Sequence, residues 1–281
     1  MGGWIVALAR FGQIFCVAGA TLQLVVGVRA QESPSPTVCR FEIAGTGKVR
    51  AVTDGRSFAL DDGREIRLAG IEVPLPPRPG EIGPRADAGI AARDALGSIV
   101  ADQNVEFRQH GATDRYDRAL AFVHVARDRQ QQSVAHEMLA RGFARVSAHV
   151  GERACAEELL ARERTARQAK LGLWGEPYYV ILGADSTAKL AAERGHFTVV
   201  EGKVSSVRES GGTIYVNFGR RWSQALTVTI PKRHERTFLA AGMEPRRLEN
   251  RRVRVRGWVE ERNGPRIEAT RPEQIEIAER N

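Results

Sequence analysis

Two arginines lie in segments that would hold their side chains in fixed positions. Arg67 lies in a segment that alternates between apolar and polar residues, and Arg118 ends the short charged segment 114–118. A guanidinium group carries a planar fork of donors that matches two oxygens of a phosphate. Either guanidinium could therefore bind an anion. The alternative for each arginine is an ordinary salt bridge, which Arg118 could form with Asp114 or Asp117.

The segment 52–74 must position Arg67. Its turn residues and alternating pattern predict a β-hairpin with strands over residues 57–60 and 65–71. Side chains two positions apart share one face of a strand, so four apolar residues of the hairpin should share a buried face: Phe58, Leu60, Ile66 and Leu68. Arg67 is then held on the opposite face of a rigid sheet.

Three motifs follow in order between residues 45 and 175. D-G-x-[ST] precedes the hairpin and R-L-x-G-I-[DE]-x-P follows it, residues 114–118 have the sequence DRYDR, and residues 170–174 have the sequence KLGLW. Together they resemble the calcium-dependent thermonuclease family, the staphylococcal-nuclease-like domains. The resemblance implies a mainly β fold with helices, in which an OB-fold five-stranded barrel carries three helices. It also implies nuclease activity on DNA or RNA.

The resemblance assigns roles to single residues. Arg67 and Arg118 match the two arginines that bind and polarise the phosphate, so they are predicted as catalytic residues. Glu72 matches the second of two aspartates that hold calcium in the family, and it is a further catalytic candidate. Arg56 and Tyr116 are predicted to bind substrate.

The sequence departs from the family at the positions that activate water. Arg56 stands where the family has its first calcium-binding aspartate, although a hard divalent cation requires oxygen ligands. Leu75 stands where the family has the carboxylate that acts as general base. We therefore expect no metal and no other cofactor, and phosphodiester hydrolysis is doubtful. One remaining route to catalysis has Arg56 supplying the charge of the metal while Glu72 or Glu81 reaches the water.

The N-terminus has the pattern of a targeting segment. Residues 1–30 combine Arg10, an apolar stretch and the small residues of a signal-peptidase site, and residues 31–44 form a linker rich in proline and serine. Cleavage after Ala30 predicts a periplasmic or secreted protein without a stable membrane partner. The alternative is a chain anchored by the uncleaved segment.

Export changes what the cysteines can do. Cys39 and Cys155 would remain as an even pair in an oxidising compartment, where they could form a disulfide. The alternative is two buried free thiols. No third or fourth ligand lies at the spacing of a zinc site, so no metal is predicted here either.

The remaining elements of residues 45–175 complete a barrel with helices. A helix is predicted from Pro84 to about residue 100, and strands are predicted over residues 105–107 and 120–125. Two further helices are expected over residues 133–141 and 154–170, and Trp174 should anchor the last of them. Residues 176–195 change in character and are predicted to connect two domains.

Residues 196–281 are predicted to form a second, smaller OB-like β-barrel. Five strands are expected with a helical region at 237–241, and the strands cover residues 199–207, 213–218, 226–230, 253–259 and 266–277. This arrangement is similar to OB-fold modules. It rests on the order of elements and not on diagnostic residues.

Aromatic and basic residues alternate in this second domain. Tyr215, Phe218, Trp222 and Trp258 stand near arginines that include Arg254, and a single-strand groove combines stacked aromatic rings with cations in this way. Tyr215 and Arg254 are therefore predicted to bind substrate. The alternative places the aromatic side chains in the core and the arginines on a solvated face.

Charge agrees with a polyanionic ligand. The 281 residues contain 42 Lys and Arg against 34 Asp and Glu, which gives a net charge of +8. We predict an exported thermonuclease-family protein that binds nucleic acid through an arginine pair. The alternatives are an active periplasmic or secreted nuclease with an altered site, and a non-catalytic module that binds a protein partner.

Overall fold

A computed structural model describes residues 39, 41–109, 113–114, 116–127 and 130–278. The predicted signal peptide at 1–30 and most of the predicted linker at 31–44 lie outside these residues. Within the part of the chain that is described, no helix is both long and apolar enough to cross a membrane.

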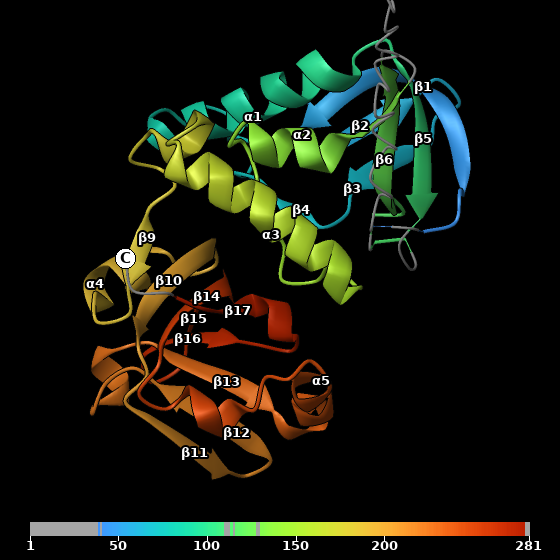
Figure 1. Ribbon diagram of the computed structural model, residues 1–281. Helices are drawn as coiled ribbons and strands as arrows, with labels where there is room; N and C mark the ends of the chain where they lie inside the picture. Colours follow the sequence, from blue (N-terminus) through green and yellow to red (C-terminus); the bar gives the residue numbers. More distant parts are fainter. Residues whose placement is uncertain (1–38, 40, 110–112, 115, 128–129, 279–281) are drawn as a thin grey trace, which may run out of the picture. The chain divides into compact units, whose positions relative to one another are not determined.

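A closed barrel forms the first region (Figure 1). Its six-stranded sheet has the order β3-β2-β1-β5-β6-β7, and a parallel pairing of β3 with β6 closes five of these strands into a barrel. The strands are β1 (Gly45–Asp54), β2 (Ser57–Leu60), β3 (Glu65–Leu68), β5 (Asn104–Gln109), β6 (Ala119–Arg127) and β7 (Gln130–Ser133). The short strands β4 (Ile71–Glu72) and β8 (Arg145–Val146) pair beside the barrel.

The predicted hairpin is confirmed, except that its second strand ends at Leu68 and Ile71 belongs to the separate strand β4. β2 and β3 pair antiparallel, and the four apolar residues expected on one face are buried in the barrel core: Phe58, Leu60, Ile66 and Leu68. Gly70 follows β3 with a positive φ of 78°, where an added Cβ would lie 2.9 Å from side-chain atoms of Leu159 and Phe122. A larger residue at this position would therefore strain the segment that leads to Glu72.

Three helices pack on the barrel, as predicted. They are α1 (Pro84–Val100), α2 (Val134–Ala140) and α3 (Arg153–Gln168). Pro84 begins α1, and the Ser133 side chain caps α2 by accepting a hydrogen bond from the His136 backbone N–H. A disulfide joins Cys39 to Cys155 on α3 across 116 residues, which confirms the predicted pairing.

The segment predicted as a connection contains regular structure. After the 3₁₀ helix η1 (Gly172–Trp174) come β9 (Ile181–Gly183) and α4 (Thr187–Ala192). Trp174 is buried against Leu173 and Tyr179 in a small apolar cluster, as its predicted anchoring role requires. β9 pairs in parallel with a strand of the following region, so this segment extends the second sheet system.

The second region contains two sheets, with strand orders β17-β14-β10-β9 and β11-β12-β13-β16-β15. The strands are β10 (Phe197–Lys203), β11 (Ser206–Ser210), β12 (Thr213–Asn217), β13 (Thr227–Pro231), β14 (Arg252–Trp258), β15 (Glu260–Glu261), β16 (Pro265–Glu268) and β17 (Ile275–Ile277). The helical pieces are α5 (Glu235–Ala240) and the 3₁₀ helices η2 (Trp222–Gln224), η3 (Lys232–His234), η4 (Pro245–Leu248) and η5 (Pro272–Gln274).

Two of the predicted strands are interrupted. The strand expected over 199–207 leaves one sheet at Lys203 and enters the other at Ser206, and the strand expected over 266–277 is divided by η5, which begins at Pro272. β13 lies parallel to β16 and β14 pairs antiparallel with β10, but these two pairings belong to different sheets. The closed OB-like barrel for residues 196–281 stays a prediction.

Candidate phosphate-binding site

Arg67 is held at the centre of the candidate site by the barrel. It lies on β3, opposite Ser57 on one side and Leu120 on the other. Among the described residues, its half-buried guanidinium makes no hydrogen bond or ion pair. Burial lowers the pKa of Arg67, and the nearby cations of Arg56 and Arg118 lower this pKa further. An anion placed here would therefore meet three positive charges, which we call the arginine cradle.

Arg56 lies beside Glu72, the carboxylate that matches a calcium-binding aspartate in the family that the sequence resembles. Its Nη1 lies 2.7 Å from Glu72 Oε2 and donates to the Ile71 carbonyl oxygen at 2.9 Å. Its backbone N–H donates to Asp54 Oδ1 at 2.8 Å. Both side chains of the ion pair are only 12% exposed. Arg56 thus engages one carboxylate oxygen of Glu72, one of Asp54 and the carbonyl oxygen of Ile71.

Arg118 forms a salt bridge to Asp114, which was the alternative to phosphate binding for this arginine. Its Nε and Nη2 lie 2.9 and 2.8 Å from Asp114 Oδ2, and its backbone N–H donates to Asp114 Oδ1. Burial raises the pKa of Asp114, but hydrogen bonds from Arg118 and Tyr116 outweigh it and lower this pKa to about 2. The exposed Tyr116 ring lies 5.0 Å from the Arg118 guanidinium. Asp114 thus fixes the orientation of Arg118 on its short loop.

The carboxylates that could act on water occupy other places. Leu75, at the position where the family has its base, is 51% exposed in the loop after β4. Glu81 accepts a hydrogen bond from the Arg78 backbone N–H at 2.9 Å within the same loop. Glu72 is engaged by Arg56.

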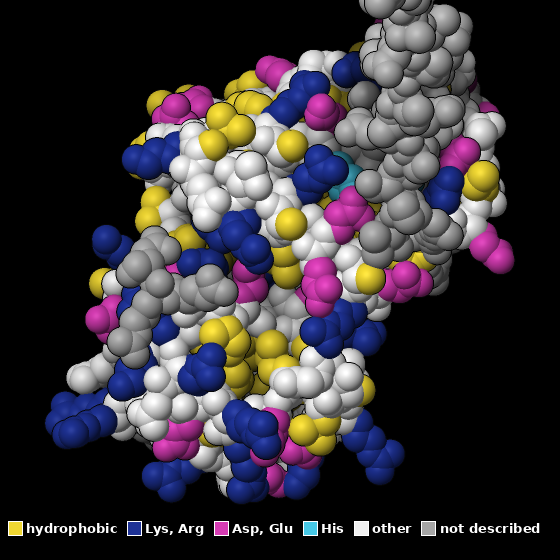
Figure 2. Space-filling view, viewed as in Figure 1, with side chains coloured by type: hydrophobic (Ala, Val, Ile, Leu, Met, Phe, Trp, Pro, Cys, Tyr) yellow, Lys and Arg dark blue, Asp and Glu magenta, His cyan; other side chains and the backbone are white. Residues whose placement is uncertain are grey.

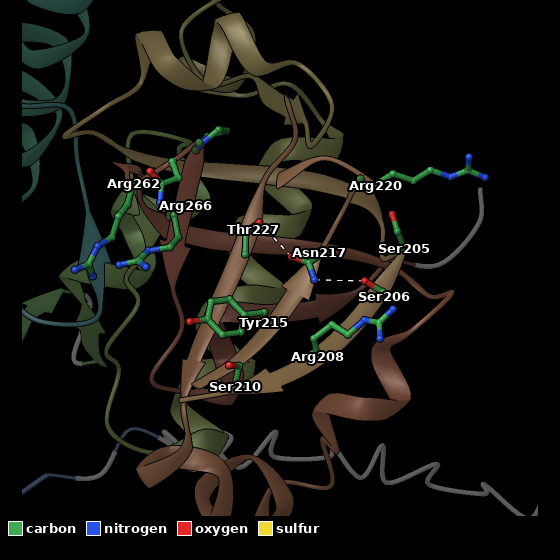
Figure 3. Close-up of a pocket in the computed structure, with 14 residues that line it drawn as sticks. Ser205, Ser206, Arg208, Ser210, Tyr215, Asn217, Arg220, Thr227, Arg262 and Arg266 are labelled. Atoms are coloured by element: carbon green, nitrogen blue, oxygen red, sulfur yellow. Dashed lines mark hydrogen bonds between the residues drawn. The ribbon is translucent and has the colours of Figure 1, made fainter. Parts of the chain in front are cut away.

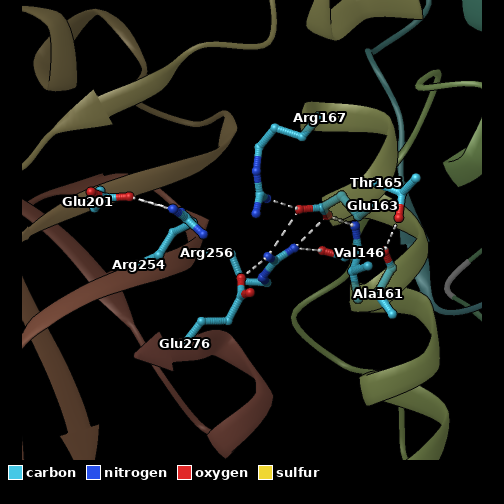
Figure 4. Close-up of polar contacts among 9 residues, drawn as sticks. All are labelled: Val146, Ala161, Glu163, Thr165, Arg167, Glu201, Arg254, Arg256 and Glu276. Carbon is cyan, nitrogen blue, oxygen red and sulfur yellow. Dashed lines mark hydrogen bonds and ion pairs between the residues drawn. The ribbon is translucent and has the colours of Figure 1, made fainter. Parts of the chain in front are cut away.

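A buried ion network fixes the strand beside Glu72. β8 pairs with β4, so that Arg145 faces Glu72 and Val146 faces Ile71. The Val146 N–H donates to Glu163 Oε2 at 2.6 Å, and the same oxygen accepts from Arg256 Nη1 at 2.7 Å (Figure 4). Further ion pairs complete the network, and they join Glu163 to Arg167 and Arg256 to Glu276.

No pattern in the sequence predicts this network. Glu163 lies on a helix that is rich in charged residues, and nothing in its spacing separates it from the solvated acids of α3. Arg256 lies on β14 with Arg252 and Arg254, and the spacing of these arginines does not single out the buried one. Burial raises the pKa of Glu163, but the adjacent Arg256 outweighs it and lowers this pKa, so the carboxylate is charged.

One group of possible metal ligands occurs among the described residues. It consists of Cys39, His136 and Glu158, whose ligand atoms all lie within 4.8 Å of one another. The sulfur of Cys39 is bonded to Cys155 in the disulfide and is not a thiolate. Burial lowers the pKa of His136 to about 4.

The two substrate-binding candidates of the second region lie on different sheets. Tyr215 on β12 lines a pocket of about 840 Å³ together with four arginines (Figure 3). Arg254 on β14 is paired with Glu201, and its Nη2 lies 2.6 Å from a carboxylate oxygen. Phe218 is buried in the core, whereas Trp258 is partly exposed. The side chain of Trp222 lies outside the description.

Signals for the pocket were only partly visible in the sequence. Tyr215 was predicted to bind substrate, but Arg208, Arg262 and Arg266 were not, because their common place in the pocket depends on the pairing of four strands. The register that places Arg208 opposite Tyr215 is the information that was lacking. Figure 2 shows Lys and Arg side chains gathered over the part of the molecule that holds these strands.

The fold and the cradle define a nuclease-type barrel. Residues 65–176 match the family described as Staphylococcal nuclease homologue. The match includes Arg67, Glu72, Leu75 and Arg118, but it begins after Arg56.

Two curated proteins are similar over longer stretches. "Probable endonuclease LCL3" of Verticillium alfalfae is 29% identical over 185 residues, which cover 64% of this chain and 60% of that protein. "Protein ParB" of Escherichia coli is 31% identical over 140 residues, which cover 48% of this chain and 75% of that protein. The chain belongs to the family of staphylococcal nuclease homologues.

Proposed function

We propose that the first region binds the phosphodiester backbone of nucleic acid, with Arg67 and Arg118 as the phosphate-binding pair. The observation that carries the proposal is the half-buried guanidinium of Arg67, which has no partner among the described residues and lies near two further arginines. A bound phosphate would supply the missing counter-charge. Charge-assisted hydrogen bonds to phosphate are about twice as strong as neutral ones.

We further propose that the cradle does not use calcium. Calcium takes six to eight oxygen ligands, whereas Arg56 places a cation within 2.7 Å of Glu72 Oε2. Hydrolysis is therefore slow or absent, because a positioned general base contributes about 10²- to 10⁴-fold to a rate and Leu75 cannot act as one.

The second candidate is hydrolysis by an altered site. Here Arg56 would replace the charge of the metal, and Glu72 or Glu81 would position the water. The printed name of the Verticillium relative, a probable endonuclease, favours this candidate. The ion pair between Arg56 and Glu72 argues against it, because the carboxylate is already a hydrogen-bond acceptor for a cation.

Export belongs to the same proposal. The disulfide between Cys39 and Cys155 supports folding in an oxidising compartment, where such bonds persist. A periplasmic or secreted protein would meet nucleic acid outside the cytosol. The alternative is a non-catalytic module that binds a protein partner.

The test compares binding with cleavage. Labelled single-stranded DNA and RNA are offered to the oxidised protein with calcium and with a chelator. We expect binding in both conditions, weakened by Arg67→Ala and not by Arg93→Ala, which removes a charge from an exposed pair on α1. We expect calcium-dependent cleavage only in the double variant Arg56→Asp with Leu75→Glu.

Calcium-dependent cleavage by the unaltered protein that is lost in Arg67→Ala would overturn the proposal that calcium is not used. Binding that Arg67→Ala leaves unchanged would overturn the role of the cradle.

A further inference from the structure

A polar pocket opens on the outer face of the five-stranded sheet of the second region. Its volume of about 840 Å³ lies within the range of ligand sites, roughly 300–1,000 Å³. The register places Ser206, Asn217, Thr227 and Arg266 side by side across β11, β12, β13 and β16. We call this pocket the sheet pocket.

The charge of the sheet pocket is positive throughout. Four arginines line it, Arg208, Arg220, Arg262 and Arg266, and no carboxylate is among its lining residues. Within the described residues, the side chains of the first three form no hydrogen bond or ion pair. Arg266 reaches Glu260 at the rim, at 3.3 Å. Most of this charge is therefore free to meet an anion.

Between the arginines lies a row of neutral hydrogen-bonding groups. Thr227 Oγ1 donates to Asn217 Oδ1 and Asn217 Nδ2 donates to Ser206 Oγ, each at 3.3 Å. Figure 3 shows this row between Arg262 and Arg266 on one side and Arg208 and Arg220 on the other.

The half-buried ring of Tyr215 provides an aromatic surface in the same pocket. It lies opposite Arg208 in the strand register, beside the row of neutral groups. A planar base could stack on this ring while its phosphates meet the arginines. A small inorganic anion would need only the cations. The aromatic ring and the neutral hydrogen-bonding groups therefore favour a ligand that has planar bases as well as phosphates.

We propose that the sheet pocket binds a single strand of nucleic acid as a second site, separate from the arginine cradle. The two sites share no residue. The outer face of the second and third strands binds oligonucleotides or oligosaccharides in OB-folds, and β12 and β13 occupy the corresponding places here. The inference rests on the proposed function for its ligand class. Its residues and its test are independent of Arg67.

The experiment measures binding of a labelled oligothymidylate to the oxidised full chain over a series of salt concentrations. The pocket variant is Arg208→Gln with Arg262→Gln. The matched control is Arg246→Gln with Arg247→Gln, which removes the same charge from η4, outside the pocket. Tyr215→Ala and Tyr215→Phe test stacking, since phenylalanine keeps the aromatic ring.

We expect the pocket variant to lower the slope of log affinity against log salt by about 1.4, because each lost phosphate contact on a single strand contributes about 0.7. Tyr215→Ala should weaken binding by about 5- to 150-fold, and Tyr215→Phe should restore most of the affinity. The η4 control should stay within about twofold.

Three results would overturn the inference. The pocket variant could bind the oligothymidylate with the same affinity and the same salt dependence as the η4 control. A duplex could bind as tightly as the single strand, with Tyr215→Ala without effect. A sulfated polysaccharide could bind without being displaced by the single strand, which would indicate an anionic glycan site. The affinity of Arg67→Ala is measured in parallel. If Arg67→Ala loses affinity and the pocket variant does not, this inference fails while the role of the cradle stands.

Discussion

The two regions of the molecule hold their arginines in opposite ways. In the cradle, Arg56 and Arg118 are fixed by Glu72 and Asp114, and only Arg67 remains without a partner. In the sheet pocket, three of the four arginines have no partner within the described residues. Carboxylate pairing restricts the rotamers of a long side chain, so the cradle suits one phosphate in one orientation. The sheet pocket suits a flexible chain of phosphates.

The same difference applies to how each region is stabilised. The first region contains the disulfide and the closed barrel. The second region has two sheets without a disulfide among the described residues, and Arg256 on β14 joins Glu163 of α3 in the buried network. Stability experiments can therefore separate the two regions, and binding experiments can separate the two sites.

The largest expected effect is on the first region. Reduction of the disulfide should lower the free energy of unfolding by about 5 kcal/mol, because the bond closes a loop over a separation of 116 residues. Urea unfolding with and without reductant measures this loss. The double variant Cys39→Ser with Cys155→Ser serves as control, and its stability should not respond to reductant. Equal stability of the reduced and oxidised proteins would contradict the prediction.

The next effect concerns the network that joins the regions. Glu163→Ala leaves Arg256 buried without its main counter-charge, and loss of one partner from a buried pair costs roughly 3–5 kcal/mol. Urea unfolding checks the value. Glu157→Ala on the same helix is the control, since its ion pair with Arg153 is exposed and should contribute less than about 1 kcal/mol. A similar small loss in both variants would show that the network contributes little.

Acid should weaken the first region through its histidines. Burial lowers the pKa of His124 and of His136 to about 4, from an ordinary value of 6.5. As the pH falls from about 6.5 to 4, the two histidines are protonated in the unfolded chain before they are protonated in the folded chain. The free energy of unfolding therefore decreases over this range. Each histidine contributes a slope of at most about 1.4 kcal/mol per pH unit.

Unfolding measured at several pH values tests this slope. His136→Gln should make the pH dependence shallower, because it removes a buried imidazole whose pKa is lowered. A slope that is the same in His136→Gln as in the unaltered protein would assign the acid sensitivity to other groups, such as the Glu163 network.

The sequence predicts more of the first region than of the second. In the first, motifs with local spacing were sufficient to predict the hairpin, the helices and the disulfide, because turns, alternation and caps act over a few residues. The partners of Arg56 and Arg118 were also near in sequence. In the second, the shared face of Arg208 and Arg266 arises only when four strands pair, and the chain changes sheet between Lys203 and Ser206. The local sequence pattern does not determine the register between strands that are distant in the sequence.

The smallest effect tests the contrast between paired and unpaired arginines directly. Arg254 is predicted from the sequence to bind substrate, yet its guanidinium is engaged by Glu201, which also holds Arg252. Because this charge is already neutralised, Arg254→Gln should change the affinity for a single strand by less than about twofold and the stability by no more than about 1 kcal/mol.

The matched comparison is Arg208→Gln, which removes an exposed and unpaired charge of the same kind from β11. Its loss of affinity should be larger and should shrink as salt rises, since released counterions drive contacts to phosphate. If Arg254→Gln weakens binding as strongly as Arg208→Gln, pairing to a carboxylate does not remove an arginine from nucleic-acid binding. The four-stranded sheet would then belong to the binding surface, and the contrast between the two kinds of arginine would have to be given up.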